Sequence, residues 1–252
     1  MNLQIILDRF YNYVDNYKEN GKLCKLLQEK LEHIERVAAN SVYIAKSEGW
    51  SDTDVIKAQL CGFYHDVGRF FQYKQYKTFS DSKSVNHGQH GFDVINENNM
   101  FEGMNSSDAQ VILDAVHYHN ALNIPEGLSE ESMRFTKLVR DADKIDIFFQ
   151  LTDAIESKTL DNHKDLLWDL PIGEPNPVIV EKLLNNKGAL FSDIKSGTDV
   201  CLMQLCWLYS MNYKASIAKL KENRTIELMQ TILPNTGTIR KCINHIKDYV
   251  SY

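Results

Sequence analysis

The chain has 252 residues, 43% hydrophobic and 25% charged, and carries a formal net charge of -6 at pH 7. This hydrophobic content suffices for a substantial core, in one large domain or two small ones. The negative charge disfavours nonspecific binding to nucleic-acid phosphates, and a content of only 12 Gly and 5 Pro disfavours a turn-rich all-β fold.

Amphipathic helices are predicted along most of the chain, because apolar residues recur at intervals of three and four. In chain order, these helices occupy about residues 3–17, 22–48, 51–66, 88–98, 106–120 and 131–156. After a proline-rich break at 171–177, further helices are predicted at about 178–185, 199–222, 225–233 and 238–249. No segment sustains a period of two, so the chain is predicted to be all-α.

A single domain is predicted over residues 1–252. Its core is expected at residues 22–156, and residues 157–252 are expected to form a helical appendage packed on that core. Within the core, residues 72–86 lack an apolar period and are rich in Lys, Ser and Tyr, which predicts a loop or lid.

The remaining global features indicate a cytoplasmic protein. Its five cysteines are scattered without a C-x-x-C pair, which is typical of reduced thiols rather than of a disulfide framework or a zinc-thiolate site. An acid, Asp8, interrupts the N-terminal segment before a secretory apolar run could form. The longest apolar segment, near residues 200–208, is too short to span a bilayer, so no membrane partner is expected.

Metal-binding side chains fall on faces or ends of several predicted helices, as in the metal sites of helical bundles. The candidates are His33, His65, Asp66, His87, His117 and Asp143. Imidazole and carboxylate ligands without thiolate suit divalent Mn, Fe, Co, Ni, Zn or Mg. Six such groups exceed what one catalytic ion needs if it keeps open positions for water. The pattern therefore favours two ions over one, with Asp66 as a bridge between them.

The order of these motifs resembles the HD superfamily of metal-dependent phosphohydrolases. That family has a lone His, then a His-Asp pair, then a distant Asp, and this order is met by His33, His65-Asp66 and Asp143. The resemblance implies an all-α HD-domain helical bundle, here with additional C-terminal helices. It also implies that residues 22–156 form a metal-binding core.

Local matches to the same family suggest the other site residues. The sequence His87-Gly88-Gln89-His90-Gly91-Phe92 resembles an element whose first His is a ligand, which favours His87 over the competitor His90. Val116-His117-Tyr118-His119 resembles the element carrying the next His, and there His117 is expected as the ligand, with His119 as its competitor. Arg69 falls where relatives often keep a cation near the substrate phosphate.

The function that the resemblance implies is hydrolysis of a small phosphorylated metabolite or nucleotide, a phosphomonoester, by metal-activated water. The catalytic roles are assigned to Asp66, as the metal bridge, and to Arg69, which would pair with phosphate oxygens. One branch of the family, which degrades cyclic dinucleotides, has a Gly-Tyr-Pro extension after the corresponding His. This extension is absent after His119, so cyclic dinucleotides are disfavoured as substrates. Alternative readings are a di-iron HD-fold oxygenase and a non-catalytic nucleotide-binding module. No pattern in the sequence indicates an oligomeric state.

Overall fold

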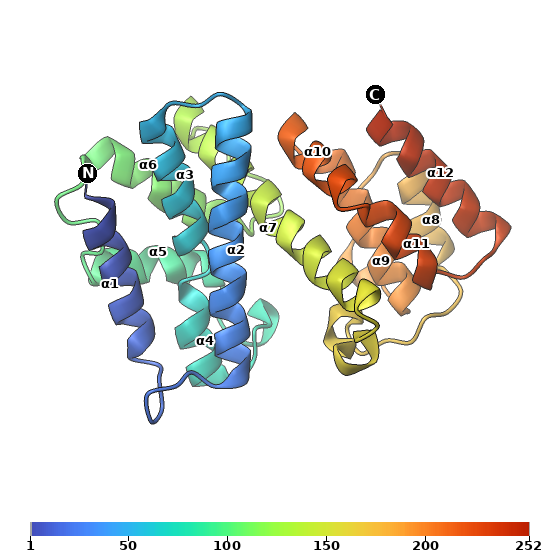
Figure 1. The fold of residues 1–252 in the computed structure, drawn as a ribbon, viewed down its shortest axis with the longest axis horizontal. Coiled ribbons are helices and arrows are strands. Elements are labelled where there is room, and N and C mark those ends of the chain that lie inside the picture. The colour runs from blue at the N-terminus through green and yellow to red at the C-terminus, as the bar shows by residue number, and fades with distance from the viewer. Residues whose placement is uncertain (1, 252) are drawn as a thin grey trace. The chain divides into compact units, whose positions relative to one another are not determined.

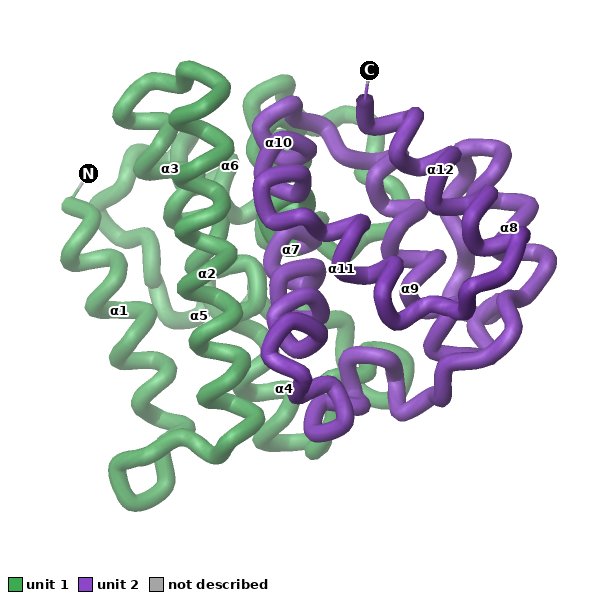
Figure 2. Tube along the Cα trace, turned by 45° about the vertical axis from the view of Figure 1, so that its right-hand side comes forward, with its two compact units in different colours: residues 1–143 green, residues 144–252 purple. Residues whose placement is uncertain are grey.

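All regular secondary structure in the computed structural model is helical, over the described residues 2–251 (Figure 1). This confirms the predicted all-α fold. The chain divides into two compact units, residues 1–143 and 144–252 (Figure 2). The division falls inside one long helix, whereas a single domain with a core ending at residue 156 was expected. The packing of residues 157–252 on that core stays a prediction.

The first unit is built from helices that follow the predicted order, with α4 (Gly68–Tyr76) as an additional helix that was not predicted. They are α1 (Leu3–Asp15), α2 (Lys25–Ser47), α3 (Asp52–Tyr64), α4 (Gly68–Tyr76), α5 (His87–Glu97), α6 (Ser106–Tyr118) and the first half of α7 (Glu130–Glu156). Side-chain caps fix where three of these helices begin. Ser51 accepts a hydrogen bond from the Asp54 N–H, Asn86 accepts one from Gln89, and Asn105 caps α6. The cap at Asn86 makes His87 the first residue of α5.

Helices α2 and α3 lie side by side at the centre of this unit (Figure 1). Their close approach depends on Gly62 of α3, because a Cβ atom there would lie 2.4 Å from the Ala38 Cα of α2. Around this contact α2 buries Ile34, Val37 and Ala38. His33 belongs to the same buried face of α2, so the contact fixes its position relative to the end of α3.

The segment predicted as a loop or lid at residues 72–86 is partly helical. Helix α4 extends to Tyr76 and ends where Lys77 adopts a left-handed conformation, with φ 55°. The helical period was hidden because α4 buries the polar Gln72. Residues 77–86, hereafter the α4–α5 loop, carry a short 3-10 turn at Asp81–Lys83.

The second unit contains the rest of α7 and the C-terminal helices. These are α8 (Pro177–Leu184), α9 (Gly197–Cys206), α10 (Lys214–Glu222), α11 (Thr225–Ile232) and α12 (Gly237–Ser251). The single helix predicted at 199–222 is interrupted, because a 3-10 turn at Trp207–Ser210 separates α9 from α10. All residues of α9 are buried, so it is the central helix of this unit. Over residues 2–251, no helix has the length and apolar character that crossing a bilayer requires.

Candidate metal centre

Histidine and aspartate side chains from separate helices of the first unit converge in two groups of three. The first group is His33, His65 and Asp143, and the second is Asp66, His87 and His119. Within each group, the three potential ligand atoms lie within 4.8 Å of one another. Five of the six residues are buried, and Asp143 is partly exposed.

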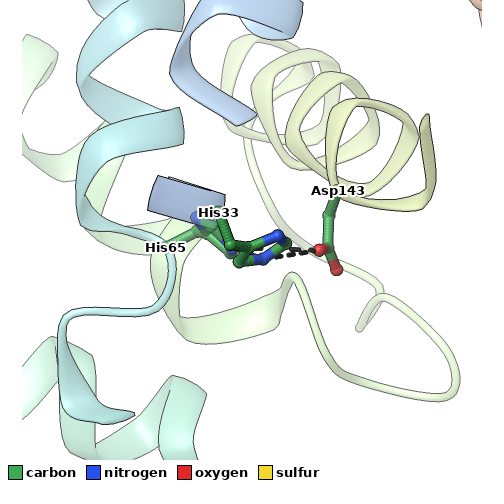
Figure 3. Close-up of side chains that lie close together, drawn as sticks. All are labelled: His33, His65 and Asp143. Atoms are coloured by element: carbon green, nitrogen blue, oxygen red, sulfur yellow. Dashed lines mark hydrogen bonds and ion pairs between the residues drawn. The ribbon is translucent and has the colours of Figure 1, made fainter. Parts of the chain in front are cut away.

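The first group joins α2, the end of α3 and α7. His33 Nε2 lies 3.2 Å from Asp143 Oδ1 and 3.3 Å from His65 Nε2. Figure 3 shows both imidazole rings directed toward the Asp143 carboxylate. Two nitrogens and one oxygen therefore face a common point, which is a donor set suited to a divalent transition metal.

The second group is made from residues at helix ends. His87 begins α5, and His119 follows the last residue of α6. Their Nε2 atoms are 2.9 Å apart. Asp66, in the turn between α3 and α4, places Oδ1 3.4 Å from His87 Nε2 and 3.7 Å from His119 Nε2.

Asp66 lies between the two groups. Its Oδ2 atom is 3.7 Å from both His33 Nε2 and His65 Nε2, while its Oδ1 atom faces His87 and His119. Each carboxylate oxygen thus faces a different pair of imidazoles. A carboxylate that bridges two ions needs this arrangement.

The hydrogen bonds of the second group indicate that a cation fits between its imidazoles. His87 Nδ1 lies 2.7 Å from Asp81 Oδ2, and His119 Nδ1 lies 2.7 Å from the Val116 carbonyl oxygen. Because both partners are acceptors, each Nδ1 carries the proton and donates it. With the ring protons on Nδ1, the two Nε2 atoms present lone pairs to each other. A metal ion bound by both would relieve this repulsion.

His65 follows the same pattern in the first group. Its Nδ1 donates to the Gly62 carbonyl oxygen at 2.7 Å, which leaves the Nε2 lone pair directed toward His33 and Asp143. The donor atoms of both groups therefore fit divalent metal ions. The assignment of individual residues as ligands stays a prediction.

Burial and neighbouring charges set the protonation states that metal ligands need. Burial lowers the pKa of His65 to about 3 and the pKa of His87 to about 4, so both imidazoles are neutral near pH 7. Burial alone would raise the pKa of Asp66, but Lys30 and Arg69 hold it well below its usual range. The site thus presents neutral imidazoles and an ionised carboxylate.

Two cations contact Asp66 directly. Lys30 Nζ donates to Oδ2 at 2.9 Å, and Arg69 Nε donates to Oδ1 at 3.2 Å. Arg69 Nη1 also reaches the α4–α5 loop, with the Phe79 carbonyl oxygen at 2.6 Å and Asp81 Oδ1 at 3.1 Å. Arg69 Nη2 takes part in none of these bonds. Arg69, which was predicted to lie near a phosphate, therefore lies at the site and also holds the adjoining loop.

The structure brings together five of the six predicted ligands, and His117 is the exception. His119 takes its place in the second group. The His117 ring instead stacks on Tyr118, with ring centroids 4.1 Å apart, and contacts Phe92. Residues 117 and 119 differ by about 200° around a helix, so only one of them can face the group. His90 lies outside both groups, and its ring packs on Phe71.

Lys30 and Asp81 lie at the site but were not predicted from the sequence. Lys30 lies three residues before His33 on α2, and that spacing places it on the same helix face. The spacing of Lys30 and His33 could therefore have identified Lys30 as a site residue. Asp81 lies in a loop without a periodic pattern, so no sequence signal placed its carboxylate against His87.

Comparison with known proteins agrees with this geometry. Residues 31–156, half of the chain, match the family model described as HD domain. The matched range contains both groups of three. The chain therefore belongs to the HD-domain family of metal-dependent phosphohydrolases. Searches among curated proteins and among solved structures found no match.

Proposed function

We propose that this HD-domain protein hydrolyses the phosphomonoester of a small metabolite or nucleotide. The observation that carries the proposal is the position of Asp66, whose two oxygens face two separate imidazole pairs and also contact two cations. Such an arrangement combines ligands for two metal ions with positive charge for an anionic substrate.

Under this proposal, each group holds one divalent ion and Asp66 serves both. His33, His65 and Asp143 would bind the first, and His87 and His119 the second. A bound ion supplies a water molecule whose pKa falls from ~15.7 toward ~7, which makes it a nucleophile near neutral pH. The buried imidazoles keep their Nε2 lone pairs directed into the site through their Nδ1 hydrogen bonds.

Lys30 and Arg69 provide positive charge where a phosphate would lie. Both side chains are partly exposed, 20% for Lys30 and 16% for Arg69, so a solute can reach them. The Arg69 Nη2 group is not used by Asp66 or by the α4–α5 loop and can donate to a non-bridging phosphate oxygen. The charge that develops on the phosphate oxygens in the transition state would then be stabilised by fixed donors.

A phosphate-release panel tests the proposed reaction. Purified protein is supplied with Mn²⁺ or Co²⁺ and assayed on nucleoside monophosphates, sugar phosphates and other small phosphomonoesters, beside an Asp66→Ala variant. We expect release with wild type and a loss of at least 100-fold in the variant. Metal-loaded wild type that releases no phosphate from any member of the panel would contradict the proposal.

Lys30 offers a test of substrate binding that is separate from metal binding. Lys30→Met removes one cation from the site and should raise KM for the best substrate about tenfold, while the metal content is retained. The matched control is Lys25→Met on the same helix, because Lys25 is 79% exposed and pairs only with Glu29 among the described residues. Equal kinetic effects of the two substitutions would exclude the assigned role of Lys30.

A further inference from the structure

Asp81 of the α4–α5 loop contacts both parts of the candidate site. Its Oδ2 atom accepts from His87 Nδ1 at 2.7 Å, and its Oδ1 atom accepts from Arg69 Nη1 at 3.1 Å. The Asp81 carboxylate therefore links His87, a candidate metal ligand, to Arg69, the cation proposed to bind the phosphate.

The position of Asp81 is fixed by two side-chain amides, one in α4 and one just after α6. Gln72 of α4 is fully buried, and its Nε2 donates to Asp81 Oδ1 at 2.9 Å and to the Val85 carbonyl oxygen at 3.0 Å. Asn120, after α6, donates to Asp81 Oδ2 at 3.1 Å. The carboxylate is thus held between α4 and the end of α6 and is not a freely moving loop side chain.

We propose that Asp81 is a positioning residue that sets the tautomer and orientation of His87 for the second metal ion and holds Arg69 beside the same ion. The inference rests on the proposed function only for the role of Arg69, since the effect on His87 concerns metal binding alone. An ionised carboxylate accepts from Nδ1–H, so the Nε2 lone pair of His87 is kept available.

Replacing Asp81 should weaken one of the two ions and not the other. In Asp81→Asn the side-chain shape is kept, but an amide NH₂ can donate to His87 Nδ1, which would move the ring proton to Nε2 and block the ligand atom. We expect the second ion to bind 10- to 100-fold more weakly, with the first ion unchanged. Asp81→Ala, which has no acceptor at all, should show the same selective loss.

Calorimetric titration of chelator-treated protein with Mn²⁺ measures the affinity of each of the two metal sites without any substrate. The matched control is Asp93→Asn, which removes the same charge from α5, where Asp93 accepts from Gln89 and lies outside both groups. Thermal melting of each metal-free variant shows whether it is folded. The assignment would be overturned if both Asp81 variants bound two ions as tightly as wild type. It would also be overturned if a folded variant lost affinity equally for both ions.

A double-mutant cycle with His87→Ala separates positioning from general damage to the loop. If Asp81 acts through His87, Asp81→Asn adds no further loss of Mn²⁺ affinity in the His87→Ala background. Losses that add in full would show that Asp81 does not act through that ring. These outcomes remain distinct from the phosphate-release test, because wild type could bind two ions with or without hydrolysing a phosphomonoester.

Discussion

The histidine at the end of α6 shows how much the function of a residue depends on its exact position. His117 and His119 are two residues apart, and both follow the apolar face that predicts the helix. Only His119 is turned toward Asp66 and His87, while His117 stacks on Tyr118. Helix ends vary by one or two residues from what a sequence indicates, so a pattern alone cannot choose between two such neighbours.

The two histidines make a matched pair for mutation. His119→Ala should weaken the second ion by at least 100-fold, because it removes a nitrogen that lies 2.9 Å from the other imidazole of the group. His117→Ala should leave Mn²⁺ affinity within about twofold of wild type. Calorimetric titration of both variants measures this. A larger loss of Mn²⁺ affinity in His117→Ala than in His119→Ala would show that His117 is the ligand.

At the scale of helices, the site depends on how closely α2 and α3 pack. Gly62 lies where α3 meets Ala38 of α2. It is three residues before His65, and its carbonyl oxygen accepts a hydrogen bond from His65 Nδ1. Apolar residues of the two helices are buried around it. A change at this contact therefore moves His33 and His65 relative to each other.

Gly62→Ala should destabilise the protein by about 1–3 kcal/mol, because the new methyl group would overlap the Ala38 backbone and force the helices apart. Chemical denaturation of the metal-free protein measures this free energy of unfolding. The control is Gly237→Ala at the start of α12, where an added Cβ meets no atom within 4 Å. A Gly62→Ala variant as stable as the control would contradict the packing argument.

At the scale of the whole molecule, the candidate ligands all belong to the unit formed by residues 1–143. Asp143 is the last residue of that unit and lies within α7, which continues into the second unit. Metal binding should therefore stabilise the folded first unit, since the unfolded chain has no assembled site.

Mn²⁺ at a free concentration of 100 times its Kd should stabilise the folded protein by about 2.7 kcal/mol for each independent site. The expected result is a rise in Tm on addition of Mn²⁺ to chelator-treated wild type. Asp66→Ala should show a much smaller rise, because both ions lose a ligand. Equal shifts for the two proteins would show that the ions bind elsewhere.

The sequence predicted most of the helices, their order and five of the six grouped side chains, because apolar periodicity and the spacing of His33, His65-Asp66 and Asp143 are local or ordered signals. Contacts made by loops could not be predicted from the sequence. Asp81 contacts His87 from an irregular loop in which Gln72 donates a hydrogen bond to the Asp81 carboxylate, and no periodic pattern in the sequence encodes these contacts. The buried Gln72 likewise concealed α4 itself.

Metal content shows whether Asp66 organises a site for two metal ions. Wild type and Asp66→Ala are purified without chelators and supplied with the same excess of Mn²⁺. After removal of unbound metal, elemental analysis gives the number of equivalents per chain. We expect close to two equivalents for wild type and a large loss in the variant. A wild-type protein that binds no metal under these conditions would show that the two groups of His and Asp side chains are not metal sites.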